Sequence, residues 1–252
     1  MTVKETRLLM GMPITVEAVD AWASAAALDA VFAYFQYVDD TFSTYKPASE
    51  ITRINAGALD LAQASEDMQT VFRLAAQTKC QTDGYFDIAC DGAYDPSGLV
   101  KGWAIANAAQ LLRAGGLRNF YVEAGGDIQA CGHNADGQSW RVGIRNPFAM
   151  EEIVKVLAIS NGGVATSGTY VRGQHIRNPK NKRIISEIVS LTVIASDIYE
   201  ADRFATAAFA MGRAGIHFIE RLPGFEGYMI DRDGQATLTT GFERYVCNDS
   251  MG

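Results

Sequence analysis

The sequence lacks several patterns that would assign a function class at once. It has four cysteines in 252 residues, and no two of them show the CxxC spacing of a zinc or redox motif. Its three histidines are scattered along the chain, so a histidine-rich zinc site is not expected. We expect the cysteines to be free thiols, which is typical of proteins in a reducing compartment.

Long apolar runs are also missing. No stretch approaches the roughly 20 apolar residues that a membrane-spanning helix needs, so we expect no membrane insertion. The first residues, MTVKETRLLMGMPITVEAV, lack the apolar core of a signal peptide. These absences predict a cytoplasmic protein, although an exported protein that has lost its signal would show the same pattern.

Positive charge is scarce as well. Lys and Arg number 22 against 29 Asp and Glu, which gives a net charge of −7 and a pI of 5.0. The chain as a whole therefore has no basic footprint for nucleic acid, and we expect no nucleic-acid partner. The one basic run, RNPKNKR at 177–183, is predicted to be an exposed hairpin loop.

The sequence does contain residue patterns typical of helices and strands along its length, and 48% of its residues are hydrophobic. Asp20 and Ser65 are predicted helix caps, 43–55 is predicted to be a polar loop, and no linker or repeat divides the chain. We therefore predict one α+β domain over residues 1–252. Its expected helices lie at about 20–38, 66–80, 101–114, 199–212 and 215–222. Its expected strands lie at about 12–19, 119–124, 127–132, 140–145, 153–160, 163–171, 188–196, 227–233 and 236–246.

Loops rich in Gly or Asp stand out at residues 8–13, 86–103, 123–132 and 164–179. Glycine lets a backbone approach a ligand closely, so such loops can bind phosphate through their N–H groups. Lys101 would add a positive charge near a helix N-terminus. Each loop alone is equally well explained as a tight turn. None matches GxGxxG or the Walker A spacing, so a standard dinucleotide or nucleoside triphosphate fold is not expected.

Asp202 and Thr206 lie four residues apart in a predicted helix, so their side chains share one helix face. One explanation is local, with Thr206 bonded to a carbonyl one turn earlier and Asp202 exposed. The other is a hard-cation site, since Mg²⁺ prefers carboxylate, hydroxyl and carbonyl oxygens. His175 also has two interpretations, a packed loop ring or a general base near a phosphate.

Eight stretches, in this order, resemble the ApbE family, the FAD:protein FMN transferases. They are MGMPITV, DDTFSTYKPASEITRIN, GYFDIA, DPSGLVKGWAI, EAGGDIQACG, WRVGIRNP, VATSGTYVRG…HIRNP and ADRFATAAFAMG. The resemblance covers nearly the whole chain. It implies a single ApbE-like α+β domain whose mixed, T-fold-like sheet is flanked by helices, with FAD in a cleft.

The resemblance also implies an activity. Proteins of this family transfer the FMN moiety of FAD to a Thr or Ser hydroxyl of an acceptor protein and release AMP, with Mg²⁺ or Mn²⁺ bound. The acceptor carries a flavinylation motif that ends roughly in S/T-G-A-T. Asp202, Thr206 and the Gly98 carbonyl match the metal ligands of the family. The positions that match its FAD contacts are Met10, Tyr45, Tyr85, Phe86, Asp87, Asp95, Lys101 and Ile176.

Cleavage of the FAD phosphoanhydride needs positive charge at the phosphate oxygens, which Mg²⁺ and Lys101 would supply. The acceptor hydroxyl must also lose its proton. We assign that base to His175, with Asp127 as the alternative. Two other functions stay open: an FAD pyrophosphatase that gives FMN and AMP, and a non-catalytic FAD-binding protein.

Overall fold

The structure is a computed structural model and describes residues 2–169 and 177–247. Its centre is a large sheet with the strand order β1-β2-β5-β6-β9-β10-β11-β12, and each of its pairings is antiparallel. The strands of this sheet are β1 (Val3–Leu9), β2 (Met12–Ala18), β5 (Phe120–Ala124), β6 (Asp127–Cys131), β9 (Gly162–Gly168), β10 (Ile188–Ala195), β11 (Glu226–Asp231) and β12 (Ala236–Leu238).

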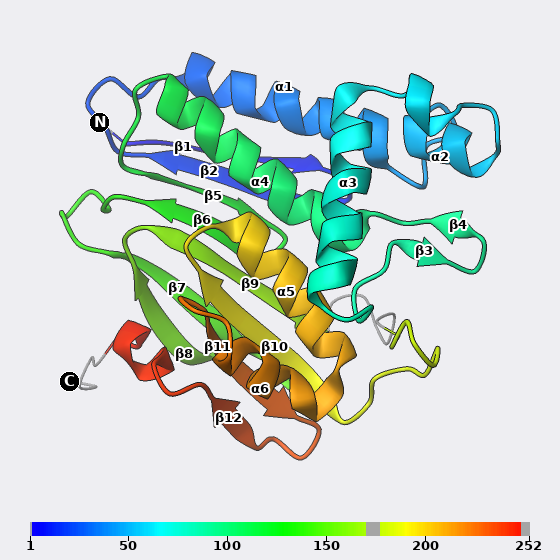
Figure 1. The fold of residues 1–252 in the computed structure, drawn as a ribbon. Coiled ribbons are helices and arrows are strands. Elements are labelled where there is room, and N and C mark those ends of the chain that lie inside the picture. Colours follow the sequence, from blue (N-terminus) through cyan, green and yellow to red (C-terminus); the bar gives the residue numbers. More distant parts are fainter. Residues whose placement is uncertain (1, 170–176, 248–252) are drawn as a thin grey trace.

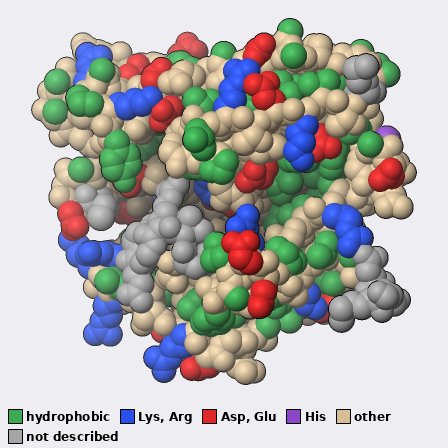
Figure 2. All heavy atoms as spheres, turned by 180° about the vertical axis from the view of Figure 1, so that it is seen from behind, with side chains coloured by type: hydrophobic (Ala, Val, Ile, Leu, Met, Phe, Trp, Pro, Cys, Tyr) green, Lys and Arg blue, Asp and Glu red, His purple; other side chains and the backbone are tan. Residues whose placement is uncertain are grey.

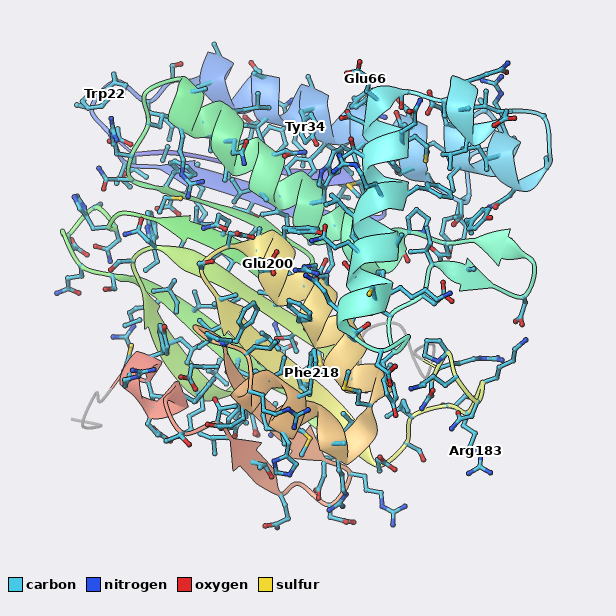
Figure 3. All side chains as sticks on the ribbon, viewed as in Figure 1. Trp22, Tyr34, Glu66, Arg183, Glu200 and Phe218 are labelled. Atoms are coloured by element: carbon cyan, nitrogen blue, oxygen red, sulfur yellow. The ribbon has the colours of Figure 1, made fainter. Side chains whose placement is uncertain are left out.

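The longer helices lie on one face of the large sheet (Figure 1). Helices α1 and α4 cover its β1 to β6 half, while α5 and α6 cover β9 to β11. Tyr34 points from α1 towards α4 (Figure 3), where its hydroxyl accepts a hydrogen bond from the Asn107 amide at 2.9 Å. The helices are α1 (Ala25–Phe42), α2 (Glu50–Asn55), α3 (Glu66–Gln81), α4 (Ser97–Ala114), α5 (Ile198–Ala210) and α6 (Gly215–Glu220).

A hairpin of β7 (Trp140–Asn146) and β8 (Ala149–Ile159) packs on the opposite face of the sheet. Side chains that alternate along a strand point to opposite faces, so each central strand serves two cores. On β9, for example, Ala165 belongs to the core under the helices and its neighbour Val164 to the core under the hairpin. The molecule is therefore built in three layers: helices, large sheet and hairpin. A second, short hairpin joins β3 (Ala89–Cys90) and β4 (Ala93–Tyr94).

The predicted α+β class, with a sheet flanked by helices, is confirmed, but the strand pairings of the large sheet are antiparallel rather than mixed. Ser65 caps α3 as predicted, because its hydroxyl accepts a hydrogen bond from the Met68 N–H at 3.2 Å. Asp20 is not a helix cap: Ser24 caps α1, and the Asp20 carboxylate instead accepts the N–H groups of Arg118 and Asn119. The sequence pattern could not show this contact, because its partners lie about one hundred residues away along the chain.

Other elements also differ from the prediction. Helix α4 begins at Ser97 rather than Lys101, because the Asp95 carboxylate accepts the Ser97 N–H in a turn that starts the helix early. Helix α2 lies inside the predicted polar loop and is capped by Ser49. The last strand ends at Leu238, and the 3₁₀ turn that follows carries Phe242 into the core under the hairpin.

The basic run at 177–183 is an exposed hairpin loop, as predicted. Arg177 pairs with Ile184, and the Asn178 N–H donates to the Arg183 carbonyl at 2.8 Å. Arg183 projects outward from this loop (Figure 3). Within the described ranges, no helix combines the length and apolarity that crossing a membrane requires.

Candidate active site

A cavity of about 950 Å³ opens between the large sheet, the start of α4 and the β7–β8 hairpin. Figure 2 shows the molecule from behind, with a hollow near the middle of this face that side chains of both charge signs border. The loops predicted to bind a ligand meet at this cavity although they are far apart in sequence. Among the residues that line it are Gly11, Tyr85, Asp95, Gly98, Lys101, Gly126, Asp127, Thr166, Asp202 and Thr206.

Asp202 and Thr206 face this cavity from α5, which packs against α4. The Asp202 side chain is buried, and its Oδ2 accepts the Gly102 N–H at 2.7 Å. The Thr206 hydroxyl lies 3.4 Å from the Gly98 carbonyl oxygen and 3.5 Å from the Ser167 hydroxyl. The local explanation for the pair is therefore wrong for Asp202, which is not exposed, and Thr206 reaches across to α4 and β9.

Lys101 lies between two carboxylates. Its ammonium group contacts Asp127 Oδ2 and lies 3.3 Å from Asp202 Oδ1. Asp127 is itself fixed, because its Oδ1 accepts the Thr166 N–H at 2.9 Å. Since both carboxylates are almost fully buried, this chain of contacts holds one positive charge at the floor of the cavity.

The oxygen atoms at this place fit a hard divalent cation. A carboxylate, a hydroxyl and a backbone carbonyl come from Asp202, Thr206 and Gly98, and all three residues line the cavity. Mg²⁺ is bound in proteins by one or two carboxylates together with neutral oxygens, water and substrate phosphate. Within the described residues, no three His, Cys, Asp or Glu side chains lie close enough together to hold a metal ion.

A glycine turn forms another part of the cavity wall. Gly125 and Gly126 have positive φ angles of 60° and 96°, which residues with a side chain rarely adopt. The Gly126 N–H donates a hydrogen bond to the Glu123 carboxylate at 2.6 Å, which stabilises this turn. The turn places Asp127 at the start of β6, directly after the backbone that lines the cavity.

The loop from Tyr85 to Asp95 closes another side. Phe86 is buried beside Gly98. Asp87 forms an ion pair with Lys79 at 2.6 Å. The Lys180 ammonium group lies over the Tyr85 ring, 4.6 Å from the centre of that ring. These three residues and Asp95 line the cavity. The basic loop at 177–183 contacts this part of the chain, since Lys180 also forms an ion pair with Asp83 at 2.7 Å.

Not every predicted residue is at the cavity. Met10 and Tyr45 are absent from its lining, and Tyr45 is 94% exposed in the loop after α1. His175 and Ile176 lie outside the described residues. Sequence reasoning missed Gly102 and Ser167 as contacts of Asp202 and Thr206. Both stand inside stretches that the sequence already marked, SGLVKGWA and VATSGTYV, but only the packing of α4 and β9 on α5 reveals what they touch.

The fold and the cavity together define an α+β protein with a deep cleft in which oxygen donors and one lysine gather from distant parts of the chain. This chain belongs to the ApbE family: the model of that family matches residues 10–95 and 91–229.

Named relatives agree with this membership. The chain is 33% identical over 155 residues to the FAD:protein FMN transferase of Salmonella typhimurium, a match that covers 58% of this chain and 44% of that protein. It is 35% identical over 128 residues to the protein of the same name from Vibrio cholerae, covering 47% of this chain and 38% of that protein. The matched region thus spans less than half the length of these curated relatives.

Solved structures show the same fold. The apbe protein of Thermotoga maritima has a TM-score of 0.86 and 20% identity, and the match covers 97% of this chain and 99% of that chain. The flavin transferase ApbE of Vibrio cholerae has a TM-score of 0.84 and 23% identity over the same shares.

Proposed function

We propose that this protein transfers the FMN moiety of FAD to a Ser or Thr hydroxyl of an acceptor protein and releases AMP, with Mg²⁺ or Mn²⁺ bound. One observation carries the proposal: Asp202, Thr206 and the Gly98 carbonyl share one cavity with Lys101 and Asp127. The names of the relatives, FAD:protein FMN transferase, support the choice of substrate.

Asp202, Thr206 and the Gly98 carbonyl would hold the cation. The bound cation would neutralise phosphate charge on the FAD pyrophosphate as the phosphoanhydride breaks. Lys101 would supply a second positive charge for the phosphate oxygens from the floor of the cavity. Its two carboxylate neighbours keep the ammonium group oriented, so that little reorganisation is needed when the substrate binds.

The transfer forms one bond and breaks another at the flavin-side phosphorus. The acceptor oxygen attacks this phosphorus, the bond to the oxygen of the AMP phosphate breaks, and the hydroxyl proton passes to a base. Asp127 has both oxygens engaged, one by Lys101 and one by the Thr166 N–H. This arrangement suits a residue that positions Lys101 better than one that accepts a proton, so His175 is our proposed base.

Tyr85 and Phe86 supply aromatic surface on one side of the same cavity. A tyrosine ring at a cleft wall can stack on the isoalloxazine or adenine ring of FAD. The cavity volume of about 950 Å³ falls within the range of sites that bind molecules of cofactor size.

The proposal is tested with the purified protein, FAD, Mg²⁺ and a small acceptor domain that carries the S/T-G-A-T motif. Intact-mass spectrometry follows the acceptor, and chromatography follows AMP and FMN. We expect the acceptor to gain one FMN with an equal amount of AMP, and to gain none when EDTA removes the cation. Free FMN and AMP with an unchanged acceptor would assign the chain to the pyrophosphatases. FAD binding without any AMP would reduce it to an FAD-binding protein.

A further inference from the structure

The β7–β8 hairpin has two edges, and they differ. The edge of β8 is covered, because Leu157 pairs with Val246 and the Val156 carbonyl accepts the Cys247 N–H at 2.8 Å. The edge of β7 has no neighbouring strand within residues 2–169 and 177–247. An uncovered edge presents backbone N–H and C=O groups that can pair with another chain.

The register of the hairpin tells which backbone groups point outward. In an antiparallel strand the N–H and C=O of one residue point to the same side, and opposed residues either bond to each other or both point away. Val156 bonds to Cys247, so its backbone groups point away from β7. Gly143 is the residue opposite Val156, so its N–H and C=O point away from β8, towards the uncovered edge.

This edge belongs to the cavity that holds the candidate active site. Gly143, Ile144 and Arg145 line it together with Lys101 and Asp202. Gly143 is exposed, and the absence of a side chain lets another backbone come close. A Cβ at this position would lie 2.9 Å from the tip of the Ile153 side chain, which is half exposed and would have to move aside.

We propose that the open edge of β7 binds an extended segment of the acceptor protein as an added strand. The inference rests on the proposed transferase function. A chain that delivers a Ser or Thr hydroxyl must enter the cavity as a polypeptide, and outward N–H and C=O groups on a cavity wall match an extended backbone. Arg141 and Arg145 flank Gly143 on the same face of β7. Charged side chains beside an open strand edge, such as these, commonly limit its pairing with unrelated strands.

The test compares Gly143→Pro with Gly143→Ala in the transfer assay. Proline removes the outward N–H and leaves the bonds to β8 in place, as proline does on natural edge strands. Alanine keeps the N–H and reports what the added carbon costs by itself. We expect Gly143→Pro to raise the KM for the acceptor about tenfold, as for the loss of one or two hydrogen bonds. The KM for FAD should change less than about twofold, since the strand pairs with the acceptor.

Two outcomes separate this inference from the function on which it rests. If the wild-type protein transfers FMN and Gly143→Pro leaves the acceptor KM unchanged, the docking edge is wrong while the function stands. If the wild-type protein transfers nothing, both are wrong.

A second measurement needs no variant and covers the case in which Gly143→Pro does not fold. Hydrogen exchange at the Gly143 amide of the wild-type protein should slow when the acceptor domain is added. Unchanged exchange would overturn the inference. So would a wild-type dimer that shields this amide without the acceptor, because the edge would then serve a second copy of the chain.

Discussion

Gly102 on α4 and Asp202 on α5 lie closer together than two ordinary side chains would allow. A Cβ at position 102 would be 2.6 Å from the Cβ of Asp202 and 2.9 Å from the Ile198 carbonyl oxygen. Because position 102 has no side chain, the Asp202 carboxylate can reach the Gly102 N–H. In an α-helix this N–H would bond to the carbonyl of Gly98. The carboxylate therefore competes for it, which leaves the Gly98 carbonyl more available to a cation.

We expect Gly102→Ala to weaken cation binding about tenfold or more, because Asp202 must move away from the new methyl group and lose a charge-assisted hydrogen bond. Electron paramagnetic resonance of Mn²⁺ measures this affinity directly. Gly115→Ala is the matched control, since Gly115 ends the same helix with φ at −73° and a Cβ there would meet only carbonyl oxygens at 3.3 Å and beyond. Equal Mn²⁺ affinity in both variants would contradict the role of Gly102.

Asp202→Ala removes the only carboxylate of the proposed ligand set. We expect turnover with Mg²⁺ to fall about a hundredfold or more, because several kcal/mol of charge stabilisation depend on the cation. FAD binding, followed by flavin fluorescence, should be partly retained. Asp136→Ala, in an exposed turn, serves as the control for loss of an acidic side chain. Full turnover by Asp202→Ala would remove the metal assignment.

At the scale of elements, Asp20 ties the end of β2 to the segment that leads from α4 into β5. Its carboxylate accepts the N–H groups of Arg118 and Asn119 at 2.9 and 2.8 Å, and the Asn119 amide at 2.9 Å. Burial by itself would raise the pKa of this carboxyl, but the hydrogen bonds from Asn119 and Arg118 outweigh it and lower the pKa below its ordinary value. The folded state therefore favours the ionised form.

Because the pKa of Asp20 is lowered in the folded state, the stability that its hydrogen bonds contribute depends on pH. This contribution is fully present above the pKa of Asp in the unfolded chain, about 4, and is lost as pH falls through the lower pKa of Asp20 in the folded protein. We expect Asp20→Asn to destabilise the protein by about 1–3 kcal/mol at pH 7. Urea unfolding measures this loss. The difference from the wild type should shrink below about pH 4. Asp136→Asn is the control, and a difference that stays constant with pH would refute the assignment.

Most elements followed from local pattern, and the misplaced ones depended on contacts outside the predicted element. Helix α3 has a Ser cap and an apolar stripe within its own sequence, and its predicted boundary differs from the observed one by a single residue. The start of α4 depends on Asp95 just outside the expected helix. The stretch after Leu238 carries strand-forming residues but turns, because Thr239 bonds to Glu226 and the Gly227 N–H and Phe242 stacks on Tyr228.

At the scale of the molecule, the cavity is lined by residues from position 11 to position 210, so ligands should report on global stability. We expect FAD and Mg²⁺ together to raise the Tm by more than the sum of their separate effects, because each would contact the other as well as the protein. Differential scanning fluorimetry measures the shift. The synergy should disappear in Asp202→Ala. Strictly additive shifts in the wild type would argue against a cation held at the FAD pyrophosphate.

The sequence by itself determined the family and the α+β class, and it predicted which residues could bind a cation. The order of the loops and the four-residue spacing of Asp202 and Thr206 are local facts that any reader of the chain can use. It could not determine that Lys101 lies between Asp127 and Asp202, or that Tyr45 stands away from the cavity. These relations depend on how β6, α4 and α5 pack across the sheet, which periodicity does not encode.

Only the tertiary structure decided which strand edges are covered within residues 2–169 and 177–247. The register between Gly143 and Val156 depends on the hairpin, and the covered edge of β8 depends on residues about ninety positions further along the chain. Hydrogen-bond partners of a strand are set by its neighbours in space, so a strand reads the same in sequence whether its edge is covered or open. The open edge of β7 beside the candidate active site is therefore a property of the fold.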